Sequence, residues 1–126
     1  MDSFSITGTP KTPSIRFDPL AGALEISGRS TPEDPIEFYR PLLEALSKLC
    51  VTSSPRCDVT IAFEYFSTSS SRCIYNVFKK LEIYSKSGGN VVVNWLYEED
   101  DDEFLEVGED FQAIIEVPFK MVPVKK

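Results

Sequence analysis

Five consecutive hydroxyl side chains follow an apolar run near the middle of the chain. The stretch reads AFEYFSTSSSRC over positions 62–73, and the hydroxyl residues are 67–71. A Ser or Thr between a strand and a helix commonly caps the helix, because its side-chain oxygen accepts a backbone N–H. The same place suits a phosphate, which free N–H groups and the positive helix end stabilise. The residues by themselves fit either a helix cap or a phosphorylation site.

An uninterrupted acidic run, EEDDDE, occupies positions 98–103. Carboxylate oxygens are the ligands of Ca²⁺ and Mg²⁺, but the run lacks the spaced ligands and turn glycine of an EF-hand loop. Acidic side chains at a helix start are favourable without any metal. We therefore expect no metal site and interpret the run as a solvated helix start or a partner-facing patch. Its partner-facing candidates are Glu98, Glu99, Asp100 and Asp101.

Catalytic chemistry has few candidates in this sequence. The chain contains no histidine, which removes Ser–His and Cys–His pairs and the commonest zinc ligand. Its three cysteines, Cys50, Cys57 and Cys73, show no CxxC spacing, and we expect them to be buried, reduced thiols. No glycine-rich phosphate loop is present. The sequence predicts a protein that is not an enzyme, has no catalytic residue and carries no cofactor.

Charge and composition restrict the class of partner. The net charge is −7, of which the acidic run supplies six units, and the 13 basic residues form no stripe. Such a surface repels phosphate backbones, so we expect no nucleic-acid binding. No apolar run approaches the roughly 20 residues that cross a bilayer. The N-terminal sequence MDSFSITGTPKTP lacks the features of a signal peptide. We expect a cytoplasmic protein without membrane insertion.

The length of 126 residues predicts a single domain. Residues 1–13 are rich in Ser, Thr and Pro, and we expect an irregular N-terminal arm. Further along, hydrophobic periodicity indicates the elements that must position the motifs. In order, they are strands at 14–17 and 23–27, a helix capped by Ser30 or Thr31 with Pro32 first, a strand at 57–66, a helix ending near 86, a strand at 90–97, a helix at about 101–113 and an edge strand at 117–124.

Apolar side chains on these elements predict the core. Strand 57–66 should place its aromatic Tyr65 on the same face as Val59, Ile61 and Phe63, with Ala62 and Phe66 opposite. Trp95 and Tyr97 should also pack in the core, whereas Gly108 should weaken its helix by about 1 kcal/mol relative to Ala. Two helices carry core-facing stripes: Tyr39, Leu42, Leu43, Leu46, Leu49 and Cys50 in one, and Ile74, Val77, Phe78, Leu81 and Tyr84 in the other.

The element order β-β-α-β-α-β-α-β predicts an α/β fold with one mixed sheet of four or five strands, packed with helices. Strands 57–66 and 90–97, joined by a helix, should form a right-handed parallel βαβ unit. Because the carboxyl ends of parallel strands meet at one sheet edge, the hydroxyl cluster and the acidic run should lie at the same edge.

Five segments placed on these elements resemble the SiaC-family regulatory phosphoproteins of bacteria. They are GRSTPED, EFYRPL, FEYFSTSS, NWLYEEDD and EVGEDF, in the same order and at similar spacing as in the family. The resemblance covers about residues 8–119. It implies a fold similar to the STAS domain of anti-sigma factor antagonists, in agreement with the element order above.

The resemblance implies a non-enzymatic switch. In the family, a Thr after the central strand, within an Asn-Thr-Ser-Ser motif, is phosphorylated by a partner kinase and dephosphorylated by a PP2C-type phosphatase. The unphosphorylated form binds and activates a diguanylate cyclase, so cyclic-di-GMP output and biofilm formation follow its state. The matching residue here is Thr68, with Ser69 and Ser70 as alternative acceptors. Ser67 and Arg72 would be the neighbours of the phosphate.

Two positions depart from the family pattern. Ser67 stands where the family has Asn beside the phosphoacceptor, which alters the hydrogen bonding there. Thr31 stands where an aromatic residue is common in the GxSxPE segment, which alters a candidate partner-facing surface. An alternative function is that of an anti-sigma factor antagonist that binds an anti-sigma kinase. It would use the same phosphoacceptor and differ only in its partner.

Overall fold

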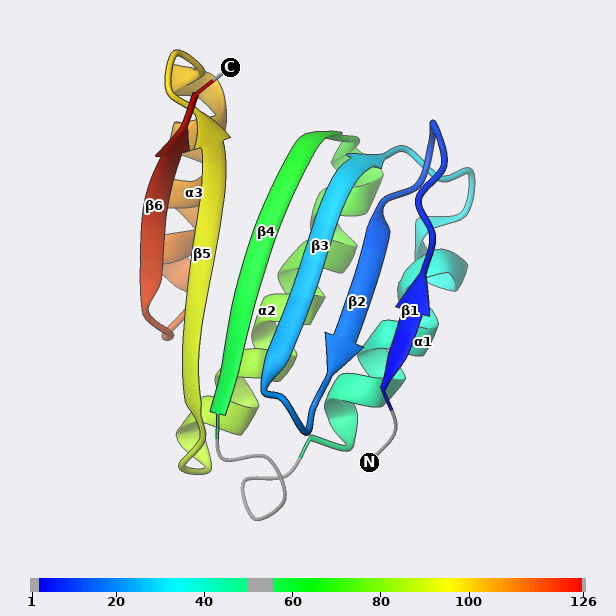
Figure 1. Cartoon of the computed structure of the whole chain (residues 1–126), viewed down its shortest axis with the longest axis vertical. Coiled ribbons are helices and arrows are strands. Elements are labelled where there is room, and N and C mark those ends of the chain that lie inside the picture. The colour runs from blue at the N-terminus through cyan, green and yellow to red at the C-terminus, as the bar shows by residue number, and fades with distance from the viewer. Residues whose placement is uncertain (1–2, 50–55, 126) are drawn as a thin grey trace.

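The computed structural model describes residues 3–49 and 56–125 of the chain. None of the helices within these ranges is long and apolar enough to cross a membrane. The elements follow the order β-β-β-α-β-α-β-α-β (Figure 1). The strands are β1 (Phe4–Ile6), β2 (Ser14–Asp18), β3 (Ala23–Ser30), β4 (Arg56–Phe66), β5 (Asn90–Glu98) and β6 (Phe119–Val124). The helices are α1 (Pro35–Ser47), α2 (Thr68–Lys86) and α3 (Asp102–Ile114).

The described strands form one six-stranded mixed sheet whose spatial order equals the sequence order. The first three strands pair antiparallel, whereas β3 to β6 pair parallel. Each parallel step passes through one helix, and crossovers of one hand place their helices on a common face. In Figure 1 the three helices lie behind the sheet and leave its front face uncovered. The predicted mixed sheet is confirmed, as is the parallel unit β4–α2–β5.

The N-terminal arm differs from the prediction of an irregular segment. Its residues Phe4–Ile6 form β1, which raises the strand count from the predicted four or five to six. Phe4 pairs with Phe17 of β2, and the two rings meet edge to face with centroids 6.2 Å apart. A three-residue strand is too short to show an alternation of apolar and polar residues in the sequence. Pairing with β2 is what makes this segment a strand.

The start of α1 also differs from the prediction. The sequence predicts a cap at Ser30 or Thr31, but the helix begins at Pro35, and Asp34 caps it by accepting a backbone N–H of the first turn at 3.2 Å. Ser30 is instead the last residue of β3, where it pairs with Phe66 and is fully buried. Pairing with β4 extends β3 beyond its predicted end and moves the helix start along the chain.

A β-bulge near the end of β4 changes which side chains face the helices. Phe63 and Tyr65 pair with consecutive residues of β3, so Glu64 has no partner there. An extra residue of this kind bends the strand and re-aims the side chains beyond it. Tyr65 is consequently 48% exposed, whereas the ring of Phe66 packs edge to face against Trp95. The predicted faces of Tyr65 and Phe66 are therefore wrong.

The core lies between the helices and the covered face of the sheet. Trp95 is fully buried, as predicted, and Tyr97 packs against the core. Cys57 and Cys73 are buried free thiols, and Cys50 lies outside the described residues. Burial raises the pKa of the Cys57 thiol to about 12, so it is protonated and unreactive at neutral pH. The predicted stripes contribute Tyr39, Leu42, Leu46, Ile74, Val77, Phe78, Leu81 and Tyr84 to the buried core.

Gly108 of α3 lies directly against the ring of Trp95 on β5. A Cβ at this position would lie 2.5 Å from Cδ1 of Trp95. The Trp95 ring cannot move easily, because it is fully buried and its Nε1–H donates to the carbonyl oxygen of Phe104 at 3.0 Å. The sequence marks Gly108 only as a weak point of the helix, whereas the structure requires it for close packing.

We expect Gly108→Ala to lower the free energy of unfolding by about 1–3 kcal/mol, the usual cost of overpacking. Helix propensity alone would raise it by about 1 kcal/mol, so the sign of the change separates the two effects. Urea unfolding measures the change, with Glu109→Ala at an exposed position of the same helix as the control. A variant more stable than the wild type would contradict the close packing.

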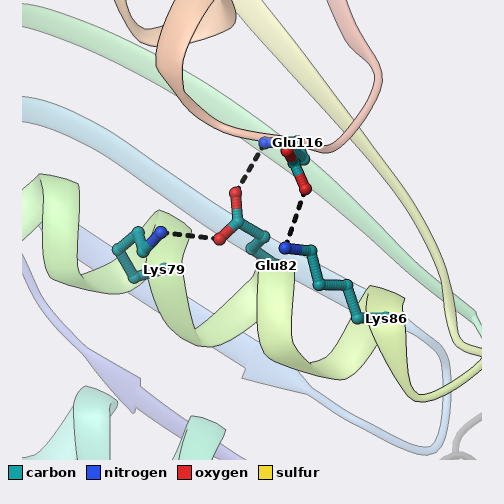
Figure 2. A network of polar contacts seen from close by, with 4 residues as sticks. All are labelled: Lys79, Glu82, Lys86 and Glu116. Carbon is teal, nitrogen blue, oxygen red and sulfur yellow. Dashed lines mark hydrogen bonds and ion pairs between the residues drawn. The ribbon is translucent and has the colours of Figure 1, made fainter.

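A buried carboxylate ties α2 to the connection between α3 and β6 (Figure 2). Glu82 is 5% exposed and accepts hydrogen bonds from the backbone N–H of Glu116 at 2.7 Å and from Nζ of Lys79 at 2.6 Å. These two hydrogen bonds lower the pKa of Glu82. Glu116 also forms an ion pair with Lys86 at 2.7 Å. The network fixes the end of α3 relative to α2.

We expect Glu82→Gln to make stability less dependent on pH. A carboxylate whose pKa is lowered by folding stabilises the protein above its unfolded pKa of about 4.3, and this contribution is lost as the pH falls. The wild type should therefore exceed the variant in stability at neutral pH, and the difference should shrink below about pH 4. Urea unfolding at both pH values provides the measurement, with the exposed Glu106→Gln as control. A difference that does not change with pH would contradict this role.

Candidate functional site

The carboxyl ends of β4 and β5 diverge beside the hydroxyl cluster. Pairing between the two strands ends at Ile61 and Trp95, although β4 continues to Phe66 and β5 to Glu98. Figure 1 shows the strands separating in this direction. Parallel strands present these ends at one edge of the sheet, which is where open α/β sheets commonly bind their ligands.

Thr68 lies at this edge, as the first residue of α2, and its side chain is exposed. The residue before it, Ser67, caps the helix, because its hydroxyl oxygen accepts the N–H of Ser70 at 3.2 Å. The cap and the exposed hydroxyl therefore belong to different residues. A helix cap and a modification site are compatible at this cluster, and neither interpretation excludes the other.

The hydroxyls beneath Thr68 form one ordered set of hydrogen bonds. Ser70 Oγ donates to the carbonyl oxygen of Ser30 at 3.0 Å, and it accepts from the hydroxyls of Ser30 at 3.0 Å and Ser67 at 3.1 Å. Each hydroxyl has one proton, so the 2.6 Å contact between Ser30 and Tyr39 is donated by Tyr39. Burial raises the pKa of the Tyr39 hydroxyl well above its usual value, which keeps this donor protonated. Hydrogen bonds from β3 and α1 thereby hold the start of α2 in place.

Burial separates the predicted acceptor residues. Ser70 is fully buried and its hydroxyl is saturated with hydrogen bonds, which corrects its assignment as an alternative phosphoacceptor. The Ser71 hydroxyl donates to the Thr68 carbonyl oxygen at 2.8 Å. Ser69 is exposed, like Thr68. Thr68 and Ser69 are therefore the two accessible candidates.

Thr68 borders a groove of about 330 Å³ between the start of α2 and the side of α3. The α3 side of this groove could not be identified from the sequence. Its apolar residues recur at helical spacing, but this periodicity does not show which part of the helix face stays uncovered. The residues that line the groove with Thr68 are Phe66, Ser67, Ser71, Val107, Asp110, Phe111 and Ile114.

The charges near Thr68 have both signs. Arg72 is exposed one turn further along α2. Among the described residues, its guanidinium has no ion-pair partner. Asp110 lies on the opposite wall of the groove. A phosphate on Thr68 would lie near the Arg72 guanidinium and the positive end of α2. Across the groove it would face the Asp110 carboxylate of α3.

The acidic run reaches the same sheet edge as Thr68, in agreement with the prediction. Glu98 ends β5, and Asp101 caps α3 by accepting the N–H of Phe104 at 3.0 Å. Glu98, Glu99 and Asp100 are exposed. Within the described part of the chain, no group of three or more His, Cys, Asp or Glu residues is arranged to hold a metal ion. The partner-facing role of these acids stays a prediction.

Thr31 follows β3 at this edge and is partly buried. Its backbone N–H and its hydroxyl both donate to the carbonyl oxygen of Lys11, at 2.7 and 3.3 Å. Thr31 thus holds the N-terminal arm against the end of the sheet. Its role as a partner-facing residue stays a prediction.

Known proteins share the fold of this chain. The family model of the SiaC family regulatory phosphoproteins matches residues 6–124 of this chain. An uncharacterized protein of Pseudomonas aeruginosa strain UCBPP-PA14 is 26% identical over 119 residues, which are 94% of each chain. The crystal structure of apo-SiaC from P. aeruginosa is 25% identical with a TM-score of 0.85, covering 98% of this chain and 100% of that one. SiaC has also been solved in complex with the diguanylate cyclase SiaD, which it activates. In that structure SiaC is 25% identical to this chain with a TM-score of 0.88, and the match covers 96% of this chain and 99% of that SiaC.

Proposed function

The chain belongs to the SiaC family of regulatory phosphoproteins, and we propose that it is a cytoplasmic, non-enzymatic switch controlled by reversible phosphorylation of Thr68. A partner kinase adds the phosphate, and a PP2C-type phosphatase removes it. The unphosphorylated form binds and activates a diguanylate cyclase and so controls cyclic-di-GMP. The observation that carries this proposal is the exposed Thr68 hydroxyl at a helix start, beside a groove and above a fully bonded hydroxyl network.

The site is suited to accept a phosphate without unfolding. The first backbone N–H groups of a helix have no intrahelical acceptor, and α2 starts at Thr68 itself. Phosphorylation adds about −1.5 to −2 charges at neutral pH, which the helix end and Arg72 would partly offset. The residues that hold the helix start, Ser67 and Ser70, are bonded inward and need not move.

A cyclase is the partner that the relatives support. SiaC of P. aeruginosa is an activator bound to a diguanylate cyclase, and this chain matches nearly the whole of that SiaC. A non-catalytic role fits the chemistry of the chain, which has no histidine and whose described cysteines are buried. The protein would therefore act on the cyclase by binding.

Mass spectrometry and co-purification test the proposal. Protein purified from its own bacterium should carry phosphate on Thr68, and treatment with a PP2C-type phosphatase should remove it. A diguanylate cyclase should co-purify with the dephosphorylated protein and form more cyclic-di-GMP in its presence. Thr68→Ala should abolish the modification, whereas the matched control Ser69→Ala should retain it. Phosphate that persists in Thr68→Ala, or a cyclase that does not respond to the protein, would contradict the proposal.

A further inference from the structure

The groove beside Thr68 continues past Phe66 into a second hollow. That hollow, of about 230 Å³, shares Phe66 and Val107 with the first and is otherwise lined by Glu64, Tyr65, Asp101, Glu103 and Phe104. The two hollows together follow α3 past the end of β4 and the start of α2. We call this surface the α3 groove.

The two ends of the α3 groove differ in chemistry. The end near Thr68 is largely apolar, with Val107, Phe111 and Ile114 from successive turns of α3. Ile114 is 58% exposed, one of few large apolar side chains that the described residues leave open to solvent. An exposed apolar side chain at the rim of an apolar hollow is a typical anchor point for a partner.

Three of the four carboxylates that line the α3 groove lie at its other end. Glu64, Asp101 and Glu103 line the second hollow, and Asp110 lines the first. Neither hollow has a Lys or Arg among its lining residues. Four carboxylates beside an apolar strip therefore favour a partner segment that carries both apolar and basic side chains.

We propose that the α3 groove docks an amphipathic, basic segment of the diguanylate cyclase, with apolar side chains against Ile114 and Val107 and Lys or Arg side chains against Glu103 and Asp110. The proposal rests on the proposed function, because it names the surface by which the switch binds its cyclase. It places Thr68 at the rim of the bound segment. A modification there would therefore act directly on the docked segment.

The test uses the cyclase that co-purifies with the protein, identified by mass spectrometry and then purified. Affinity is measured by isothermal titration calorimetry for Ile114→Ser and for Ile83→Ser. Ile83 is a matched control, because it is 64% exposed on α2 and does not line the groove. We expect Ile114→Ser to weaken binding at least about tenfold and Ile83→Ser to change it less than about twofold.

A second pair of variants tests the charges. Glu103→Gln with Asp110→Asn should weaken binding and flatten its salt dependence, because fewer charges face the basic segment. Glu109→Gln, an exposed acid on the same helix outside the lining residues, should change neither. If Ile114→Ser and the charge pair bind as the wild type does, the docking surface lies elsewhere and the proposed function still stands. If no cyclase binds the wild type, the proposed function itself fails.

Discussion

Phosphorylation of Thr68 is expected to weaken binding of the cyclase at least about tenfold and to leave the melting temperature almost unchanged. The unmodified hydroxyl is small and neutral, so a partner can close over it and over the apolar side chains of Val107 and Ile114. A dianionic phosphate there would have to lose its water, which costs several kcal/mol when no buried counter-ion is present. A loss of about 1.4 kcal/mol already lowers affinity tenfold.

Attraction between the phosphate and a basic partner acts in the opposite direction but is the smaller effect. In the proposed arrangement the basic side chains already face Glu103 and Asp110, so pairing with the phosphate would draw them away from these carboxylates. On the free protein, Arg72 and the helix end already offset part of the phosphate charge, which reduces what the partner can gain. Desolvation therefore decides the sign, and phosphorylation should weaken binding.

The measurement compares enzymatically phosphorylated and unmodified protein by calorimetric titration with the cyclase and by thermal unfolding. Thr68→Ala, treated with the same kinase, controls for modification at other residues and should keep its affinity. Equal affinity in both states would eliminate the switch. A strongly reduced melting temperature would show that the phosphate acts by unfolding the helix start.

Long periodic elements could be predicted from the sequence with nearly the observed bounds. The strand at 57–66, the helix ending near 86 and the strand at 90–97 each bury a face that the pattern displays. Their order then determines which strand ends share a sheet edge, so the position of Thr68 could be predicted before its surroundings were known.

Features that depend on pairing between distant segments could not be predicted. The bulge at Glu64 arises from the register of β4 against β3, and it exchanges the faces of Tyr65 and Phe66. Ser30 resembles a helix cap in sequence, yet strand pairing buries it in the hydroxyl network. Ser70 and Ser69 are chemically alike, and only the position of α2 against β3 makes one inaccessible.

Trp95→Ala should be the most destabilising single change at the site, with a loss of about 3–5 kcal/mol in the free energy of unfolding. Trp95 is the largest fully buried side chain within the described residues. Its ring stacks on Phe104 with centroids 4.9 Å apart and also contacts Phe66 and Phe111. These aromatic rings fill the space where β4 and β5 separate, so their packing holds α3 in place.

Trp95→Phe separates the packing of the ring from its hydrogen bond. The substituted ring still packs beside Phe104, but the Nε1–H donor to the Phe104 carbonyl oxygen is lost. The lost hydrogen bond costs about 1 kcal/mol, and the smaller ring volume adds a packing loss. Urea unfolding should therefore rank wild type above Trp95→Phe and Trp95→Phe above Trp95→Ala. Cyclase affinity, measured well below each melting temperature, should follow the same order, because the α3 groove exists only while α3 packs on Trp95. Wild-type affinity in a folded Trp95→Ala protein would show that cyclase binding does not need the position of α3.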